Sequence, residues 1–246
     1  MTSTNPLEQP IDRIAGEIAR GTRVLLLVRH AERPRIANED KTFGASLPLT
    51  PEGERQSREF GRMLRDAVRS VPVQFLASPL RRTVMTAELV AEGMGIDPGA
   101  IETDAAIGNS SAFISDELEL WECFRDTRFF DHMQEYFRAG IQRGFNPIAE
   151  ATENYEKYVL SRFTAQVGIF ATHDVFVAAF LHGKGVKTDF RKENWPCFLD
   201  AAAILLNDGG TRRYAFVRAG ISDKVCGVEP DAESIDVQPP NKESYT

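Results

Sequence analysis

Three short apolar runs, each followed at once by polar or charged residues, mark the sequence. They cover 24–28, 73–77 and 167–171 and are rich in Val, Ile, Leu and Phe. Runs of this length and composition are typical of buried strands. Two more runs, 201–206 and 214–217, flank the stretch Asn207, Asp208, Gly209 and Gly210, which favours a hairpin. We therefore expect a mixed sheet in which this antiparallel hairpin forms the edge.

Apolar positions at helical spacing predict helices that pack against this sheet. The first such helix covers 11–18. A second begins at Thr50, whose hydroxyl suits an N-cap, and has Pro51 at its first helical position. Further helices are expected from Pro79 onward and over 174–181. This alternation predicts an α/β fold, a three-layer sandwich whose mixed, mostly parallel sheet carries helices on both faces.

The domain organisation follows from where this pattern is interrupted. Residues 1–221 are expected to form a single α/β domain, because chains of this length often hold one core. Within it, 101–165 reads as an aromatic-rich helical insertion that forms a cap and excludes water from a pocket. Residues 222–246 lose all periodicity and hold six acidic residues against two lysines, a net charge of -4 (−6 + 2). We expect this acidic tail to be flexible.

Composition narrows the classes of function. The chain has 246 residues and a formal net charge of -7, which argues against a general nucleic-acid binder, because such proteins usually carry a basic stripe. No apolar run approaches the roughly 20 residues of a membrane span, and the N-terminal residues lack the apolar core of a secretion signal. The three cysteines are widely spaced and lack metal-ligand spacing. We expect a cytoplasmic protein with neither nucleic-acid nor membrane partners.

Charged and nucleophilic residues follow the three apolar runs at the point where each strand is expected to end. In an open α/β sheet, ligands bind beyond the carboxyl ends of the strands. Residues from distant parts of the chain are therefore expected to converge there, namely Arg29, His30, Arg33, Arg82, His173 and Asp174. Two imidazoles, several guanidiniums and a carboxylate suit phosphoryl transfer through a histidine.

Each residue type in this cluster has a role in such chemistry. A neutral imidazole is a capable nucleophile toward phosphorus, which favours His30. Guanidiniums bind the oxygens of the phosphoryl group in the transition state of its transfer. The leaving alkoxide needs a proton, and Asp174 is the first candidate to supply it, although it also lies where a helix begins and could serve as its N-cap. Alternative proton donors lie in the insertion, namely Glu102, Asp104 and Asp116.

Four motifs in this order resemble those of the histidine phosphatase superfamily, which has the phosphoglycerate mutase-like fold. Residues 27–34 resemble its Arg-His-Gly signature, with Ala31 in the glycine place. Residues 47–53 resemble the segment that follows this signature, and 78–83 resemble the segment that carries the second phosphate arginine. His173, preceded by Thr172, matches the late histidine of the family.

The resemblance implies a role for each matched residue. His30 would be phosphorylated during turnover, while Arg29, Arg82 and His173 would hold the phosphate without a metal or another cofactor. Arg33 takes the place of an extra phosphate-binding arginine in the acid phosphatase branch, and Asp174 takes the place of that branch's proton donor. The short chain, the few cysteines and the absence of a secretion signal argue against this branch. Whether Asp174 or an acid of the insertion donates the proton stays open.

We therefore expect a phosphomonoester hydrolase that works through a phosphohistidine on His30. Its substrate would be a small phosphorylated metabolite or a phosphoprotein. Two alternatives are a phosphomutase of the phosphoglycerate mutase type and a non-catalytic phospholigand-binding protein. The aromatic patch of the insertion could also serve as the surface of a homodimer.

Overall fold

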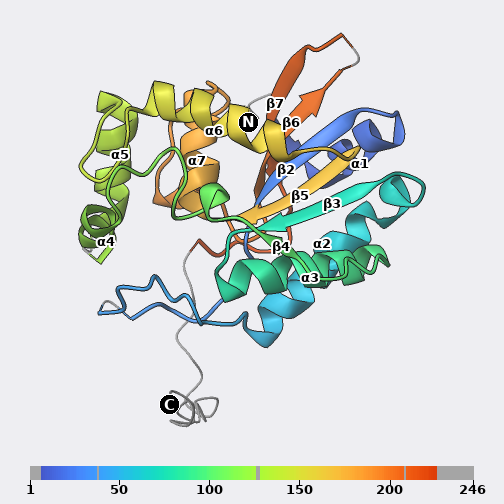
Figure 1. The fold of residues 1–246 in the computed structure, drawn as a ribbon, viewed down its shortest axis with the longest axis horizontal. Coiled ribbons are helices and arrows are strands. Elements are labelled where there is room, and N and C mark those ends of the chain that lie inside the picture. The colour runs from blue at the N-terminus through green and yellow to red at the C-terminus, as the bar shows by residue number, and fades with distance from the viewer. Residues whose placement is uncertain (1–6, 38, 126–127, 208, 226–246) are drawn as a thin grey trace, which may run out of the picture.

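A computed structural model describes residues 7–37, 39–125, 128–207 and 209–225. Its strands form one sheet in the order β1-β7-β6-β2-β5-β3-β4, shown in Figure 1. The strands are β1 (Glu8–Pro10), β2 (Arg23–Arg29), β3 (Val73–Ala77), β4 (Glu102–Thr103), β5 (Val167–Thr172), β6 (Ala201–Leu206) and β7 (Arg212–Arg218). Strand β6 runs antiparallel to both its neighbours, β2 and β7, while β3, β4 and β5 run parallel to β2. The carboxyl ends of β2, β3 and β5 therefore meet at one edge of the sheet.

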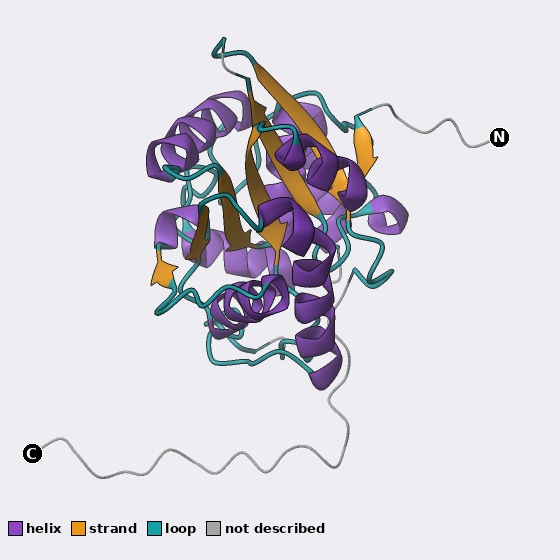
Figure 2. Ribbon diagram, turned by 90° about the vertical axis from the view of Figure 1, so that its right-hand side faces the viewer, coloured by secondary structure: helices purple, strands orange, loops and turns teal. Residues whose placement is uncertain are grey.

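Helices cover both faces of this sheet, which is visible from two directions (Figures 1 and 2). The helices are α1 (Ile11–Ala19), α2 (Pro51–Val68), α3 (Arg81–Met94), α4 (Glu117–Arg125), α5 (Phe129–Ala139), α6 (Ile148–Arg162) and α7 (Asp174–Gly183). Helices α2 and α3 lie on one side, and α6 and α7 lie on the other. The predicted three-layer α/β fold is confirmed.

Alternation along β2 explains why the sheet has two buried faces. Leu25 and Leu27 belong to one apolar cluster, which also contains residues of α6 and α7. Val24, Leu26 and Val28 belong to a second cluster, with residues of α1, α2 and α3. Successive side chains of a strand point to opposite faces, so a continuous apolar run is what a strand needs between two helical layers.

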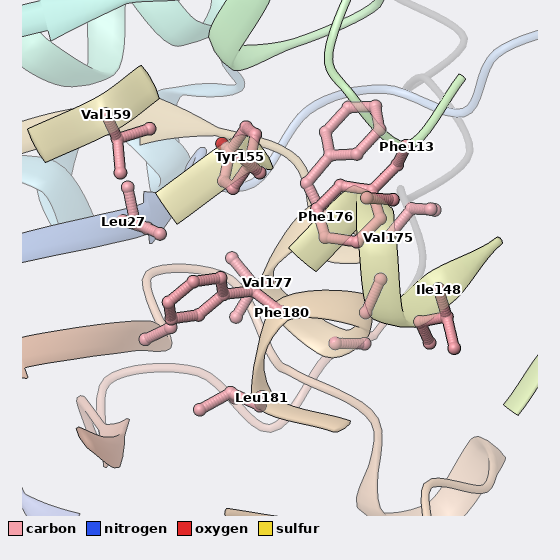
Figure 3. Packing of buried hydrophobic residues seen from close by; sticks show 14 of the residues in the cluster. Leu27, Phe113, Ile148, Tyr155, Val159, Val175, Phe176, Val177, Phe180 and Leu181 are labelled. Atoms are coloured by element: carbon pink, nitrogen blue, oxygen red, sulfur yellow. The ribbon is translucent and has the colours of Figure 1, made fainter. Parts of the chain in front are cut away.

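The first of these clusters is rich in aromatic rings, and Figure 3 shows part of it. Tyr155 of α6 packs against Phe180 of α7, with ring centroids 6.2 Å apart. Phe113, from the loop before α4, stacks on Phe176 at 6.3 Å. These contacts tie α6 and the loop before α4 to the helix that follows β5.

Local signals place several elements as expected. The Oγ1 of Thr50 accepts a hydrogen bond of 3.0 Å from the N–H of Gly53, and Pro51 is the first residue of α2. The aromatic-rich region of the insertion forms α4 and α5. Strand β4 also falls within 101–165, so this stretch contributes to the sheet as well as to the helices.

The prediction that the hairpin forms the edge of the sheet was wrong. Strands β6 and β7 do pair antiparallel, but β1 pairs with the outer side of β7, and β6 pairs directly with β2. Edge strands β1 and β4 span three and two residues, too few for an alternating pattern to be detected. Their position depends on backbone pairing with a neighbour, which leaves no mark in the side-chain sequence.

Most of the predicted flexible tail, 226–246, lies outside the described residues. Its first part runs close to the sheet edge described above. Lys224 Nζ lies 2.7 Å from Glu32 Oε2, and the N–H of Phe198 donates to the carbonyl oxygen of Lys224 at 3.2 Å. Among the described helices, none is long and apolar enough to cross a membrane.

Gly61 is expected to be essential for the packing of α2 against α3. A Cβ added there would lie 2.1 Å from the carbonyl oxygen of Val90, a backbone atom that cannot move aside locally. We expect Gly61→Ala to lower the free energy of unfolding by about 1–3 kcal/mol, despite the better helix propensity of alanine. Urea denaturation would measure the change.

Gly16 provides a matched control for this substitution. It also lies within a helix, α1, but a Cβ there would meet only the side chain of Arg20, at 3.5 Å. Gly16→Ala is expected to leave stability unchanged or to raise it by up to about 1 kcal/mol. Equal effects of the two substitutions would contradict the proposed close contact.

Candidate active site

Two histidines meet at the carboxyl ends of neighbouring parallel strands. His30 directly follows β2, and His173 directly follows β5 as the N-cap residue of α7. Their backbones are linked, because the N–H of His30 donates to the carbonyl oxygen of Thr172 at 3.0 Å. Their ring centroids lie 5.4 Å apart, and both side chains are buried. The sheet register therefore brings together residues that are far apart in the sequence.

The ring of His30 is held in a defined orientation. Its Nδ1 lies 2.8 Å from the carbonyl oxygen of Ala31. A carbonyl oxygen can only accept, so Nδ1 carries the proton and Nε2 of the neutral ring has a lone pair. Burial lowers the pKa of His30 well below its usual value, and the positive charge of Arg82 lowers it further. His30 is thus a neutral imidazole with an unprotonated Nε2, the form that a nucleophile requires.

His173 is oriented by a different group. Its Nε2 lies 2.9 Å from Ser78 Oγ, which in turn lies 3.0 Å from Thr83 Oγ1. Ser78 directly follows β3, so the third strand of the cluster fixes the ring that follows β5. Burial lowers the pKa of His173 well below its usual value, with a further contribution from the charge of Arg82.

Arg82 extends from the first turn of α3 into the cluster and is 4% exposed, whereas its neighbour Arg81 is exposed. Its Nη1 donates to the carbonyl oxygens of Phe43 and Gly44, both at 2.9 Å. Its Nε is buried and has no hydrogen-bond partner among the described residues. Burial lowers the pKa of Arg82, and the charge of Arg33 adds to this effect. A buried cation with an unsatisfied donor is stabilised by an anion.

Arg29 and Arg33 add positive charge to the same region. Arg29 is buried and places its guanidinium over the ring of Phe198, 4.2 Å from the centroid. Its Nη1 donates to the carbonyl oxygen of Pro196 at 2.5 Å, and its Nη2 donates to that of Val225 at 2.8 Å. Arg33 donates to the carbonyl oxygen of Pro34 at 2.8 Å. Both charges lower the pKa values of His30 and His173.

Asp174 is the carboxylate at this strand edge. Its Oδ2 lies 3.3 Å from Arg29 Nη2 and accepts a hydrogen bond of 3.1 Å from Trp195 Nε1. Its Oδ1 accepts from the N–H of Val175 at 3.0 Å. His173 occupies the N-cap position without a side-chain cap bond, and Asp174 is the first residue of α7. The carboxylate therefore satisfies one amide of the helix start, while its other oxygen faces Arg29.

The three acids of the insertion make their contacts elsewhere. Glu102 pairs with Arg162, and Asp104 accepts a hydrogen bond of 2.6 Å from the hydroxyl of Tyr158. Asp116 accepts from the N–H groups at the start of α4, both at 2.9 Å. The described contacts of these acids thus anchor the insertion, and none of them involves a histidine or arginine of the cluster.

Residues 25–138 match the model of the histidine phosphatase superfamily (branch 1). This stretch holds His30 and Arg82, and it lies within a fold whose sheet brings His173 to the same edge. Over residues 25–138 the chain matches the histidine phosphatase superfamily. The resemblance seen in the four motifs is thereby confirmed.

Solved structures, among them two phosphatases, share the fold of this chain. A mycobacterial glucosyl-3-phosphoglycerate phosphatase with inorganic phosphate superposes with a TM-score of 0.52 at 14% identity, covering 82% of this chain and 98% of that one. YhfR from Bacillus stearothermophilus gives 0.50 at 17% identity, covering 81% and 99%. A phosphoserine phosphatase mutant from Entamoeba histolytica, in complex with phosphoserine, gives 0.50 at 14%, covering 78% and 95%. No curated protein matches the sequence.

Sequence reasoning missed two residues of this candidate site. Ser78 had a visible signal, because it follows the second apolar run just as His30 and His173 follow the others. Trp195 had none, since it lies in a loop 21 residues after Asp174 and no local pattern relates the two. Within the described part of the chain, no three His, Cys, Asp or Glu side chains lie close enough to hold a metal ion.

The buried histidines are expected to make stability depend on pH. Their folded-state pKa values are lowered, so below the ordinary histidine pKa of 6.5 the unfolded chain takes up protons that the folded chain does not. The contribution of the two histidines to the free energy of unfolding is therefore fully present above pH 6.5 and is lost as the pH falls below it. Between roughly pH 6 and pH 5, we expect each histidine to lower the free energy of unfolding by about 1.4 kcal/mol for every pH unit of acidification. Denaturant unfolding at these pH values would measure this slope.

A single substitution separates this effect from the titration of carboxylates. His30→Asn removes one of the two groups and should make the slope shallower by about 1.4 kcal/mol per pH unit. His132→Asn in α5 is the control, because it lies outside the cluster. A wild-type slope that persists in His30→Asn would show that His30 titrates alike in the folded and unfolded chains.

Proposed function

We propose that this chain is a phosphomonoester hydrolase that forms a phosphohistidine on Nε2 of His30. The substrate would be a small phosphorylated metabolite or a phosphoprotein. The observation that carries the proposal is the 2.8 Å contact between His30 Nδ1 and the carbonyl oxygen of Ala31. It keeps the proton on Nδ1 and leaves Nε2 as a nucleophile, inside a pocket of positive charge. The match to the superfamily and the phosphatase structural neighbours support the same reaction.

The first step transfers the phosphoryl group from the ester to the enzyme. The lone pair of His30 Nε2 forms a bond to phosphorus as the bond to the ester oxygen breaks. Negative charge spreads over the three equatorial oxygens. Arg29, Arg33, Arg82 and His173 are the groups we assign to these oxygens. The unsatisfied Nε of Arg82 supports this role, because a buried donor without a partner costs about 1–3 kcal/mol.

Asp174, in its neutral form, donates a proton to the leaving oxygen, and the leaving group departs as the neutral alcohol. In the second step Asp174, now a carboxylate, accepts a proton from water while the water oxygen attacks phosphorus. The bond between Nε2 and phosphorus breaks, inorganic phosphate leaves, and both His30 and Asp174 return to their starting states. The contact with Arg29 supports Asp174 over the acids of the insertion, because it places this carboxylate at the histidine cluster.

Trapping the intermediate tests this proposal. The protein is mixed with an aryl phosphate, quenched in alkaline denaturant, in which phosphohistidine survives, and digested for peptide mass mapping. We expect one phosphoryl group on the peptide that contains His30. A quenched protein that stays unmodified during turnover, or is modified on another residue, would overturn the assignment.

A further inference from the structure

Outside the proposed reaction, and within the described part of the chain, Trp195 is the residue whose side chain donates a hydrogen bond to the proton donor. We propose that Trp195 is a positioning residue, which determines the oxygen of Asp174 that carries the transferred proton. This inference rests on the proposed function. It concerns the indole N–H, which donates to Asp174 Oδ2 at 3.1 Å.

The assignment follows from counting lone pairs on the carboxyl group. Each carboxyl oxygen has two acceptor sites. One site of Oδ2 is taken by the N–H of Trp195 Nε1, and the positively charged Arg29 Nη2 lies 3.3 Å from the same oxygen; neither of these groups can accept a proton in return. Oδ1 has one described partner, the N–H of Val175. The proton of the neutral acid is therefore directed to Oδ1.

The indole ring is held rigidly enough to enforce this choice. Trp195 is 1% exposed. The rings of Phe129, Phe130 and Phe190 meet it edge-on, with centroids 5.5, 5.5 and 5.7 Å away. Two of these rings come from α5, in the insertion, and the third from the segment after α7. A ring packed from several sides cannot rotate away from Asp174 without disturbing its neighbours.

The backbone next to Trp195 is tied to the same site. The carbonyl oxygen of Pro196 accepts the hydrogen bond from Arg29 Nη1. Asp200 Oδ2 accepts from the N–H of Cys197 at 2.8 Å and from Arg218 Nη1 at 2.7 Å, and Asp200 is itself buried. Trp195 and Arg29, which both face Oδ2, are thus fixed relative to each other through one short loop.

Without the indole N–H, Oδ2 would regain a site at which the proton could reside. The acid would then populate a form whose proton points toward Arg29 rather than toward the leaving group. This change affects only reactions that need an acid. A substrate whose leaving group is already stable as an anion, such as p-nitrophenyl phosphate, would react almost normally.

The test compares two substrates with one chemical change. Trp195 is replaced by 3-benzothienylalanine, in which sulfur takes the place of the N–H while the ring keeps its size, and by phenylalanine as a second variant. We expect kcat/KM for an alkyl phosphate to fall about 10- to 100-fold, as for a misplaced catalytic group. For p-nitrophenyl phosphate we expect less than about a 3-fold change, because the acid contributes little there.

Three controls separate the possible causes. Phe190→Leu disturbs the packing around Trp195 but leaves the N–H in place, and should affect both substrates alike. Asp174→Asn should show the same substrate selectivity as the Trp195 variants, and adding Trp195→Phe to it should cause no further selective loss. Wild-type turnover with a trapped phosphohistidine establishes the proposed function independently.

Each outcome then has one meaning. A selective loss in both Trp195 variants, with no further selective loss when Trp195→Phe is added to Asp174→Asn, supports the proposal. An equal loss for both substrates, or an unchanged ratio in a folded variant while Asp174→Asn remains selective, would overturn the role of Trp195. If Asp174→Asn itself affected the alkyl phosphate and p-nitrophenyl phosphate equally, the assignment of Asp174 as the proton donor would be wrong instead.

Discussion

Replacing His30 by alanine is expected to reduce the hydrolysis of p-nitrophenyl phosphate by at least about 10⁴-fold, the scale of loss when a nucleophile is removed. The reason is that water must then attack the phosphate directly, without the split into two easier steps. The pocket of arginines would remain, so binding of inorganic phosphate should persist. Steady-state kinetics and calorimetric titration with phosphate would measure the two properties separately.

The control for this variant is His132→Ala, which removes a histidine of α5 that lies outside the cluster. It should retain wild-type turnover. Thermal unfolding of both variants would confirm that they fold. If His30→Ala hydrolysed the aryl phosphate at the wild-type rate, the phosphohistidine mechanism would be wrong. Tight phosphate binding with no turnover by the wild-type protein would favour the non-catalytic alternative.

Asp174→Asn is expected to lower kcat/KM for alkyl phosphates by about 10²–10⁴-fold, the usual contribution of general acid catalysis. The asparagine can keep the hydrogen bond from Trp195 through its own carbonyl oxygen, but it cannot donate a proton to an alkoxide. An aryl phosphate should lose little in kcat/KM, because its leaving group needs no proton. Its steady-state rate should fall, because water attack on the phosphohistidine also uses Asp174.

Glu102→Gln and Asp104→Asn are the matched controls, since both acids were alternative donors in the sequence. Neither should alter the ratio of alkyl to aryl hydrolysis, because their described contacts are with Arg162 and Tyr158. A rapid-mixing experiment on Asp174→Asn should release a burst of p-nitrophenolate before a slow phase. If only the Asp104 variant lost hydrolysis of the alkyl phosphate, the proton donor would be an acid of the insertion rather than Asp174.

The sequence predicted the strands and helices that carry this site because their signals are local. The apolar run before His30 is long enough for a strand buried on both sides, and the structure places alternate residues of it in two separate clusters. The cap of α2 needs only Thr50 and the three residues after it. The edge strands β1 and β4 were missed, because two or three residues carry no period.

The candidate site divides in the same way. That polar residues follow each strand run is visible in the sequence, and the parallel order of β2, β5 and β3 brings their ends to one edge. That Arg82 turns inward while Arg81 is exposed depends on the carbonyl groups of Phe43 and Gly44, which lie in a loop without any pattern. The resemblance predicted Arg82 from its place in a motif, and the loop carbonyl groups give the physical reason why Arg82 turns inward.

The residue types at the strand ends were determined by the sequence alone, and with them the kind of chemistry that the chain can perform. Only the tertiary structure decided which carboxylate stands at the histidines and which indole holds it. Periodicity and capping act over a few residues, so they can be detected along the chain. The contacts that join Arg29, Asp174 and Trp195 span up to 145 positions, and they exist only because long-range backbone hydrogen bonds fix the loops in place.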